Sequence, residues 1–244
     1  MTEKNRRWNL HVQPHYPLIQ ITEDLWQVTG SFARGHLPRN MVIHRMDGGD
    51  LWLHSVIALH DESMRQLEAL GVPEFLVVPN RRHCMDAAVY KERYPKVKVL
   101  CPEAAFQQVR KILPVHGLAE EVLPMLGVGC HQPAGIRPYE LCYEVGTESS
   151  KVLVFTDLLF NLGTLSGFDG WLMKMTGFTG FFGLTTFGRF AYLKKREAFA
   201  EWLRKMASID GLKAICVAHG DAITQDPSER LEDLADQIFK IEKF

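Results

Sequence analysis

Apolar residues in the first 60 positions recur with a period of two, which is typical of half-buried strands. Three short apolar runs fit this pattern, at 25–30, 40–46 and 51–57. The Asp-Gly-Gly at 47–49 predicts a tight turn between the last two. Together these features predict an antiparallel meander.

From 60 onward the period changes to that of a helix, because Met64, Leu67 and Leu70 share one helical face before Gly71. Strands and helices then alternate. We expect strands at 75–79, 97–102, 140–145, 151–157 and 214–220, and helices at 86–94, 103–113 and 196–207. A last helix begins at Pro227 after Asp226, and Leu231, Leu234, Ile238 and Ile241 form its apolar stripe. The pattern predicts two sheets with helices outside them.

Polar residues that can bind metal follow three of the predicted strands. Asn80 and His83 come after the strand at 75–79, Asp157 ends the strand at 151–157, and His219 lies near the end of the strand at 214–220. His131 lies in a loop. Imidazole and carboxylate are zinc ligands, and such sites are usually assembled from several rigid strand ends. A carboxylate after an apolar strand, such as Asp157, is costly to bury unless it is paired or bound to metal.

Composition narrows the class of protein and its partners. The 244 residues are 46% hydrophobic, which predicts one domain over 1–244. A net charge of −1 leaves no basic field for nucleic acid. No apolar run is long enough to predict a membrane-spanning helix. Five cysteines without a C-x-x-C pair, and an N-terminus without an apolar signal core, predict a reduced, cytoplasmic protein.

The order of these elements and polar strand ends resembles the metallo-β-lactamase superfamily from Ile21 to the last helix. Within it, the turn of Pro79, Asn80 and His83 resembles a branch of bacterial proteins with a degenerate Pro-Asn-x-x-His motif. The resemblance implies an α+β fold, a four-layer αββα sandwich with the site at one edge of the paired sheets.

The family's first metal turn, His-x-His-x-Asp-His, is largely lost. Asn80, Arg82, Cys84 and Met85 stand at its four ligand places. The later ligands survive, because His131, Asp157 and His219 match the family's loop His, bridging carboxylate and final His. Two metals need more ligands than this, and Arg82 is a fixed cation that repels a dication. One divalent ion, zinc or else iron or manganese, remains consistent with the residues, with further donors drawn from His83, Cys84, His131 or Asp86.

These residues support two hypotheses. In the first, the protein is a metal-dependent hydrolase of an ester, thioester or other acyl substrate. Asp157 and His219 are then catalytic, the metal ligands are His83, His131, Asp157 and His219, and Asn80, Arg81, Arg82 and His54 contact the small-molecule substrate. In the second, the protein binds no metal and is a degenerate member of the fold that holds a small anionic ligand or a protein partner. His54 and Ser55 form either a hydrogen bond behind the site or a pair within the core.

A Gly- and aromatic-rich insertion at about 163–192 follows the Asp157 strand. Its segment 167–190 carries too many Phe residues to leave in water and too many glycines for one stable helix. The sequence leaves open whether this segment is a lid, the wall of an apolar pocket, a homodimer contact, part of the core or a shallow membrane contact.

Overall fold

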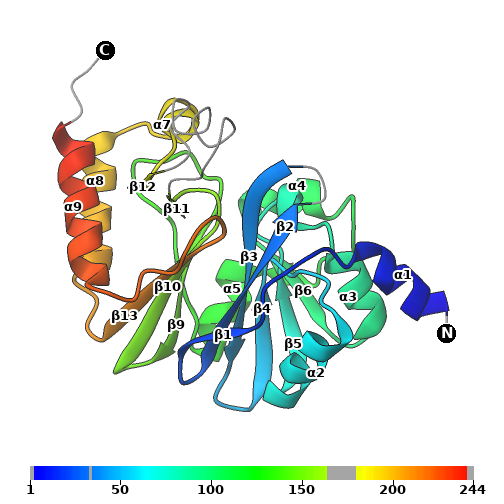
Figure 1. Ribbon diagram of the computed structural model, residues 1–244. Helices are drawn as coiled ribbons and strands as arrows, with labels where there is room; N and C mark the ends of the chain where they lie inside the picture. Colours follow the sequence, from blue (N-terminus) through cyan, green and yellow to red (C-terminus); the bar gives the residue numbers. More distant parts are fainter. Residues whose placement is uncertain (1–2, 33–34, 164–179, 241–244) are drawn as a thin grey trace. The chain divides into compact units, whose positions relative to one another are not determined.

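The computed structural model describes residues 3–32, 35–163 and 180–240. Contacts between Cα atoms divide the chain into two compact units, Met1–Cys130 and His131–Phe244, whose elements are labelled in Figure 1. Each unit has its own sheet and its own hydrophobic core. The single domain predicted over 1–244 stays a prediction.

The first unit is built on a seven-stranded sheet in the order β1-β2-β3-β4-β5-β6-β7. Its strands are β1 (Ile19–Thr22), β2 (Leu25–Phe32), β3 (Gly35–Arg45), β4 (Asp50–His54), β5 (Val72–Val77), β6 (Lys98–Cys101) and β7 (Gly117–Leu118). Strands β1 to β4 pair antiparallel, and β4 to β7 pair parallel. The predicted antiparallel meander is therefore confirmed.

The described part of this unit also contains five helices, and the first four of them share one hydrophobic core with the sheet. They are α1 (Glu3–His11), α2 (Asp61–Leu70), α3 (Ala87–Arg93), α4 (Glu103–Val109) and α5 (Ala119–Val122), with 3-10 turns η1 (Arg81–His83) and η2 (Leu123–Leu126). Met41, Ile43, Leu53 and Leu76 of the strands meet Met64, Leu67 and Tyr90 of the helices in one core. Because successive strand residues point to opposite faces, this core uses alternate positions of each strand.

Helix α1 is absent from the sequence-based expectations. Its nine residues are mostly polar, and a helix this short has little stability of its own. Trp8 anchors it: the ring packs edge-on against Tyr90 with centroids 5.0 Å apart, and Nε1 donates to the Leu59 carbonyl at 3.0 Å. The helix therefore depends on tertiary packing, which the local sequence pattern does not predict.

The second unit has a four-stranded sheet in the order β13-β10-β9-β8. The strands are β8 (Gly129–His131), β9 (Cys142–Thr147), β10 (Ser150–Phe155) and β13 (Leu212–Val217). Strand β10 pairs antiparallel with β9 and parallel with β13. Helices α8 (Arg196–Ala207) and α9 (Pro227–Lys240) share a core with this sheet. Helix α9 begins at Pro227 as predicted, while Ile241 of the predicted stripe lies outside the described residues.

Residues 164–179, most of the Gly- and aromatic-rich insertion, lie outside the described part of the chain. After them, β12 (Phe181–Gly183) pairs antiparallel with β11 (Phe160–Leu162), and the short helix α7 (Thr186–Ala191) follows. Phe182 is buried in the core of the second unit, whereas Phe187 and Phe190 on α7 are 54% and 80% exposed. The lid, pocket-wall and homodimer readings of 167–190 stay predictions.

The five cysteines, Cys84, Cys101, Cys130, Cys142 and Cys216, are all free thiols. None of the helices in the described ranges has the length and apolar character needed to cross a bilayer. Cytoplasmic location stays a prediction.

Candidate functional site

Asp157 and His219 meet because their strands are parallel neighbours. In the register of β10 and β13, Phe155 lies beside Val217, so both side chains follow two residues later at the same sheet edge. Asp157 Oδ1 lies 3.1 Å from His219 Nε2, and both side chains are more than nine-tenths buried. A carboxylate only accepts, so Nε2 carries the proton in this contact. The predicted meeting of these two residues is confirmed.

The chain around His219 holds its imidazole in place. The ring stacks on Phe160, with centroids 4.8 Å apart and 20° between the planes. The His219 carbonyl accepts from the amide of Asn161 at 3.0 Å. Gly220 has φ 115°, and a Cβ there would lie 2.0 Å from the Asn161 carbonyl oxygen. Only glycine fits this close approach, which lets the chain turn directly after the imidazole.

Two residues that contact Asp157 went unnoticed in the sequence. The Tyr139 hydroxyl donates to Asp157 Oδ2 at 3.2 Å. The Glu140 carboxylate accepts from the backbone amides of Thr156 at 3.0 Å and Asp157 at 2.7 Å. Both residues precede β9, whose antiparallel register with β10 returns them to the end of β10 where Asp157 lies. Only that pairing reveals the contact, because the two segments are 16 to 18 residues apart.

Glu140 is a carboxyl group buried beside another carboxylate. Burial, and then the charge of Asp157, raise the pKa of Glu140 to about 8, although hydrogen bonds from backbone amides act in the opposite direction. Near neutral pH the pair therefore shares less than two full negative charges. A cation placed at Asp157 would relieve the repulsion between the two groups.

His131, a predicted metal ligand, lies on β8 and forms a different contact. Its Nε2 is 2.8 Å from Glu144 Oε2, and Lys151 Nζ lies 2.6 Å from the other oxygen of the same carboxylate. These contacts with Lys151 and His131 lower the pKa of Glu144 even though burial opposes the shift. The metal-binding role of His131 stays a prediction, and its Nε2 is engaged in this structure.

In the first unit, the turn after β5 uses most of its polar atoms for its own structure. Asn80 Oδ1 accepts from the backbone amide of Arg82 at 2.8 Å and so caps η1. The Cys84 thiol donates to the Arg81 carbonyl at 2.9 Å, and burial raises the pKa of Cys84 to about 11. Cys84 is therefore a buried, protonated thiol, in keeping with the structural alternative rather than with a thiolate ligand.

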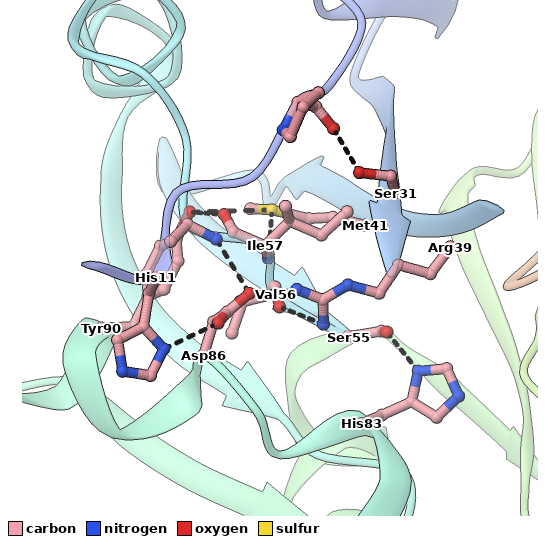
Figure 2. A network of polar contacts seen from close by, with 12 residues as sticks. His11, Ser31, Arg39, Met41, Ser55, Val56, Ile57, His83, Asp86 and Tyr90 are labelled. Carbon is pink, nitrogen blue, oxygen red and sulfur yellow. Dashed lines mark hydrogen bonds and ion pairs between the residues drawn. The ribbon is translucent and has the colours of Figure 1, made fainter. Parts of the chain in front are cut away.

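His83 is the exception in this turn. Its side chain is buried, and its Nδ1 lies 2.5 Å from the hydroxyl of Ser55 at the end of β4 (Figure 2). Ser55 has φ 57°, an unusual value for a residue with a side chain, and its amide bonds to the Val77 carbonyl. Ser55 has no exposed surface, so its hydroxyl meets His83 rather than a substrate. Ser55 thus forms the hydrogen bond to His83, while His54 stacks on Trp52, and whether the Ser55 contact lies behind a binding site stays a prediction.

Asp86, considered as an extra metal donor, is committed to a buried network (Figure 2). It pairs with the Arg39 guanidinium, and its Oδ2 also accepts from the amide of Ala58 at 3.1 Å. Its Oδ1 lies 3.0 Å from His11 Nδ1. Arg39 and Asp86 are only 2% and 3% exposed. Both oxygens of Asp86 therefore hold the fold together and are not available as the extra donor.

Arg81 and Arg82 differ from Arg39 because their side chains are exposed. Within the described residues, neither guanidinium forms an ion pair with a carboxylate. Two such cations beside His83 can accept an anionic group, and guanidinium geometry suits carboxylates and phosphates.

Comparison with known proteins identifies the fold. No protein-family model matches the sequence, and no curated protein is similar to it. Similar solved structures include the metallo-β-lactamase DIM-1 exposed to ceftazidime, at 11% identity and TM-score 0.60, covering 92% of this chain and 98% of that one. A metallo-β-lactamase from Erythrobacter litoralis, with β-mercaptoethanol in its active site, has 14% identity, TM-score 0.58 and coverages of 90% and 96%.

A third similar structure is the metallo-β-lactamase FIM-1 from Pseudomonas aeruginosa in its mono-zinc form, at 12% identity and TM-score 0.58, covering 93% of this chain and 97% of that one. Identities this low show the fold alone. The chain has the metallo-β-lactamase fold, and the predicted α+β class is confirmed.

Proposed function

We propose that this protein is a hydrolase of acyl substrates that works with one divalent metal ion, held by His83, Asp157 and His219. The observation that carries the proposal is the contact between Asp157 and His219 at the ends of β10 and β13. A buried carboxylate and imidazole at adjacent strand ends form the two-ligand core of a metal site.

The donor set suits zinc. Two imidazoles and one carboxylate are a known catalytic zinc combination, and three protein ligands leave one coordination position open. A bound ion would supply an activated water near neutral pH and polarise the acyl carbonyl. FIM-1, a metallo-β-lactamase of similar fold, has been solved in a mono-zinc form. Iron or manganese would serve similar chemistry with the same donors.

The proposal requires His83, from the first unit, to reach the Asp157–His219 pair of the second. The Ser55 contact supports this role, because a hydrogen bond at Nδ1 fixes the orientation of the imidazole, as such bonds do for ligating histidines. His131 is left outside the proposed ligand set because its Nε2 contacts Glu144. It therefore provides a matched control.

Substrate binding is assigned to the turn around His83. The exposed Arg81 and Arg82 would hold an anionic group of the substrate, and this favours acyl substrates that also carry a carboxylate or phosphate. Asn80 contributes indirectly, since its side chain caps the turn that presents both arginines. His54, buried against Trp52, contributes to the wall behind the turn.

Zinc titration of protein purified without chelator tests the metal site. We expect about one ion per chain. His83→Ala, Asp157→Asn and His219→Ala should each weaken binding by at least about 100-fold, because losing a ligand costs more than losing an outer hydrogen bond. His131→Ala should change the affinity by less than about threefold. A His131→Ala loss equal to that of His83→Ala would overturn the proposed ligand set.

Hydrolysis tests the reaction. The zinc-loaded protein should cleave chromogenic esters or thioesters bearing a carboxylate, and a chelator should abolish the activity. A metal content below about a tenth of an ion per chain, measured after supplementation with zinc, manganese or iron, would disprove the metal site. The alternative would then be a metal-free fold that binds an anionic ligand through Arg81 and Arg82.

A further inference from the structure

Tyr139 joins Asp157 to a second aromatic ring. Its hydroxyl donates to Asp157 Oδ2 at 3.2 Å. Its ring stacks on Tyr192, the residue after α7, with centroids 4.5 Å apart and 22° between the planes. Phe187 of α7 lies edge-on to Tyr192 at 6.0 Å. The phenol that contacts Asp157 is therefore one end of an aromatic row that continues onto α7.

The backbone on both sides fixes this stack. The amide of Arg137 donates to the Tyr192 carbonyl at 2.9 Å, and the amide of Lys194 donates to the Gly135 carbonyl at 2.8 Å. Gly135 has φ 72°, and a Cβ there would lie 2.2 Å from the carbonyl oxygen of Lys195. Two chain segments are thus joined tightly beside the rings. Tyr139 has little freedom to move away from Asp157.

Each hydrogen-bonding group of Asp157 has a separate partner. Oδ1 contacts His219 Nε2, Oδ2 accepts from Tyr139, and the backbone amide donates to Glu140. Only Oδ1 lies beside the imidazole. A carboxylate held at one oxygen in this way would bind an ion through the other oxygen alone.

We propose that Tyr139 is a positioning residue for the metal site, holding Oδ2 of Asp157 so that Oδ1 is the single ligand oxygen beside His219. This inference rests on the proposed function. Donor groups that hold ligating carboxylates normally tune metal affinity without touching the ion.

The hydroxyl is assigned to positioning rather than to acid catalysis because of its proton. The phenol donates that proton to Asp157, so the proton is already committed to this hydrogen bond. A purely structural tyrosine would act through its ring. Removing only the oxygen therefore separates the two roles, and Tyr192 offers the same change one ring away.

The first test compares Tyr139→Phe with Tyr192→Phe, both of which keep the ring stack. Tyr139→Phe should lower zinc affinity by about 10- to 100-fold, and Tyr192→Phe by less than about twofold. The visible spectrum of the cobalt-loaded protein should also change in Tyr139→Phe, because a released carboxylate can bind through both oxygens. Equal zinc affinities and equal cobalt spectra in the two variants would overturn the inference.

The second test needs no metal. In the metal-free protein, the Nε2 proton of His219 is held by Asp157 and should exchange slowly with water in NMR spectra. Tyr139→Phe should speed this exchange several-fold and Tyr192→Phe should leave it unchanged, because only the former frees the carboxylate. If the wild-type protein binds no zinc, the proposed function fails, and the exchange rates alone decide whether Tyr139 positions Asp157. An unchanged exchange rate in Tyr139→Phe would rule out the positioning of Asp157 by Tyr139, whether or not the protein binds zinc.

Discussion

The turn after β5 and the joined ends of β10 and β13 use polar residues in opposite ways. In the turn, Asn80 and Cys84 form hydrogen bonds with the backbone of the turn itself, Asp86 pairs with a buried cation, and the His83 imidazole contacts the Ser55 hydroxyl. At the end of β10, Tyr139, Glu140 and His219 form hydrogen bonds with Asp157, whose side chain is buried. In the first region, the side chains of Asn80, Cys84 and Asp86 therefore stabilise the fold. The second region places two carboxyl groups close together in a buried position, where their negative charges repel each other.

The largest expected effect tests the stabilising half of this comparison. Arg39→Met leaves Asp86 buried without its cation and should lower the free energy of unfolding by about 3–5 kcal/mol. Arg7→Met, which breaks an exposed pair with Glu92 at 2.7 Å, is the control and should cost less than about 1 kcal/mol. Urea unfolding measures both. Similar midpoints for the two variants would show that the buried network does not stabilise the turn.

The next effect tests the unfavourable charge in the second region. The pKa of Glu140 is raised from 4.5 to about 8 in the folded state, so the native protein holds a proton that the unfolded chain releases. The stability from this group is therefore fully present below about pH 4.5 and is lost as the pH rises towards about 8.

Urea unfolding of metal-free protein at about pH 5 and about pH 8 measures this loss. We expect the wild type to lose a few kcal/mol relative to Glu140→Gln, which cannot titrate. The lowered pKa of His44, caused by burial, acts equally in both proteins and cancels in the difference. Parallel pH profiles for wild type and Glu140→Gln would contradict the raised pKa.

A smaller effect separates strain from hydrogen bonding at Ser55. Ser55→Ala loses the contact with His83 but keeps φ 57°, whereas Ser55→Gly loses the contact and removes the strain. The glycine variant should be more stable than the alanine variant by about 1 kcal/mol, as read from thermal unfolding. Both should weaken zinc binding. Wild-type zinc affinity in Ser55→Gly would show that the hydroxyl does not orient His83.

The smallest expected effect is at Cys84. Cys84→Ser keeps a small donor to the Arg81 carbonyl, so stability should fall by about 1 kcal/mol or less. Zinc affinity should change by less than about twofold, because a buried thiol with a pKa of about 11 is a poor ligand. A tenfold loss of zinc affinity would instead indicate that the Cys84 sulfur is a metal ligand. The turn would then supply ligands as the end of β10 does.

Hydrophobic period determined most of the fold from the sequence alone. The meander, the later alternation of strands and helices and the start of α9 at Pro227 all follow from local patterns, which carry their information within a few residues. Asp157 and His219 could be identified as candidate site residues in the same way, because a polar residue directly after an apolar strand is recognisable from the local sequence. The short polar helix α1 could not be predicted in this way, because the contacts of Trp8 that stabilise it are with residues some 50 or more positions away.

Tertiary structure alone decided what surrounds the candidate ligands. Nothing near Asp157 in the sequence indicates that Tyr139 and Glu140 contact it. The register of β9 against β10 brings these residues to the end of β10, where Asp157 lies. Nothing near Asp86 indicates that Arg39 takes its charge. Local sequence determines which groups can ionise or bind, and the pairing of distant strands determines which of them are already occupied, because hydrogen bonds and burial depend on neighbours in space.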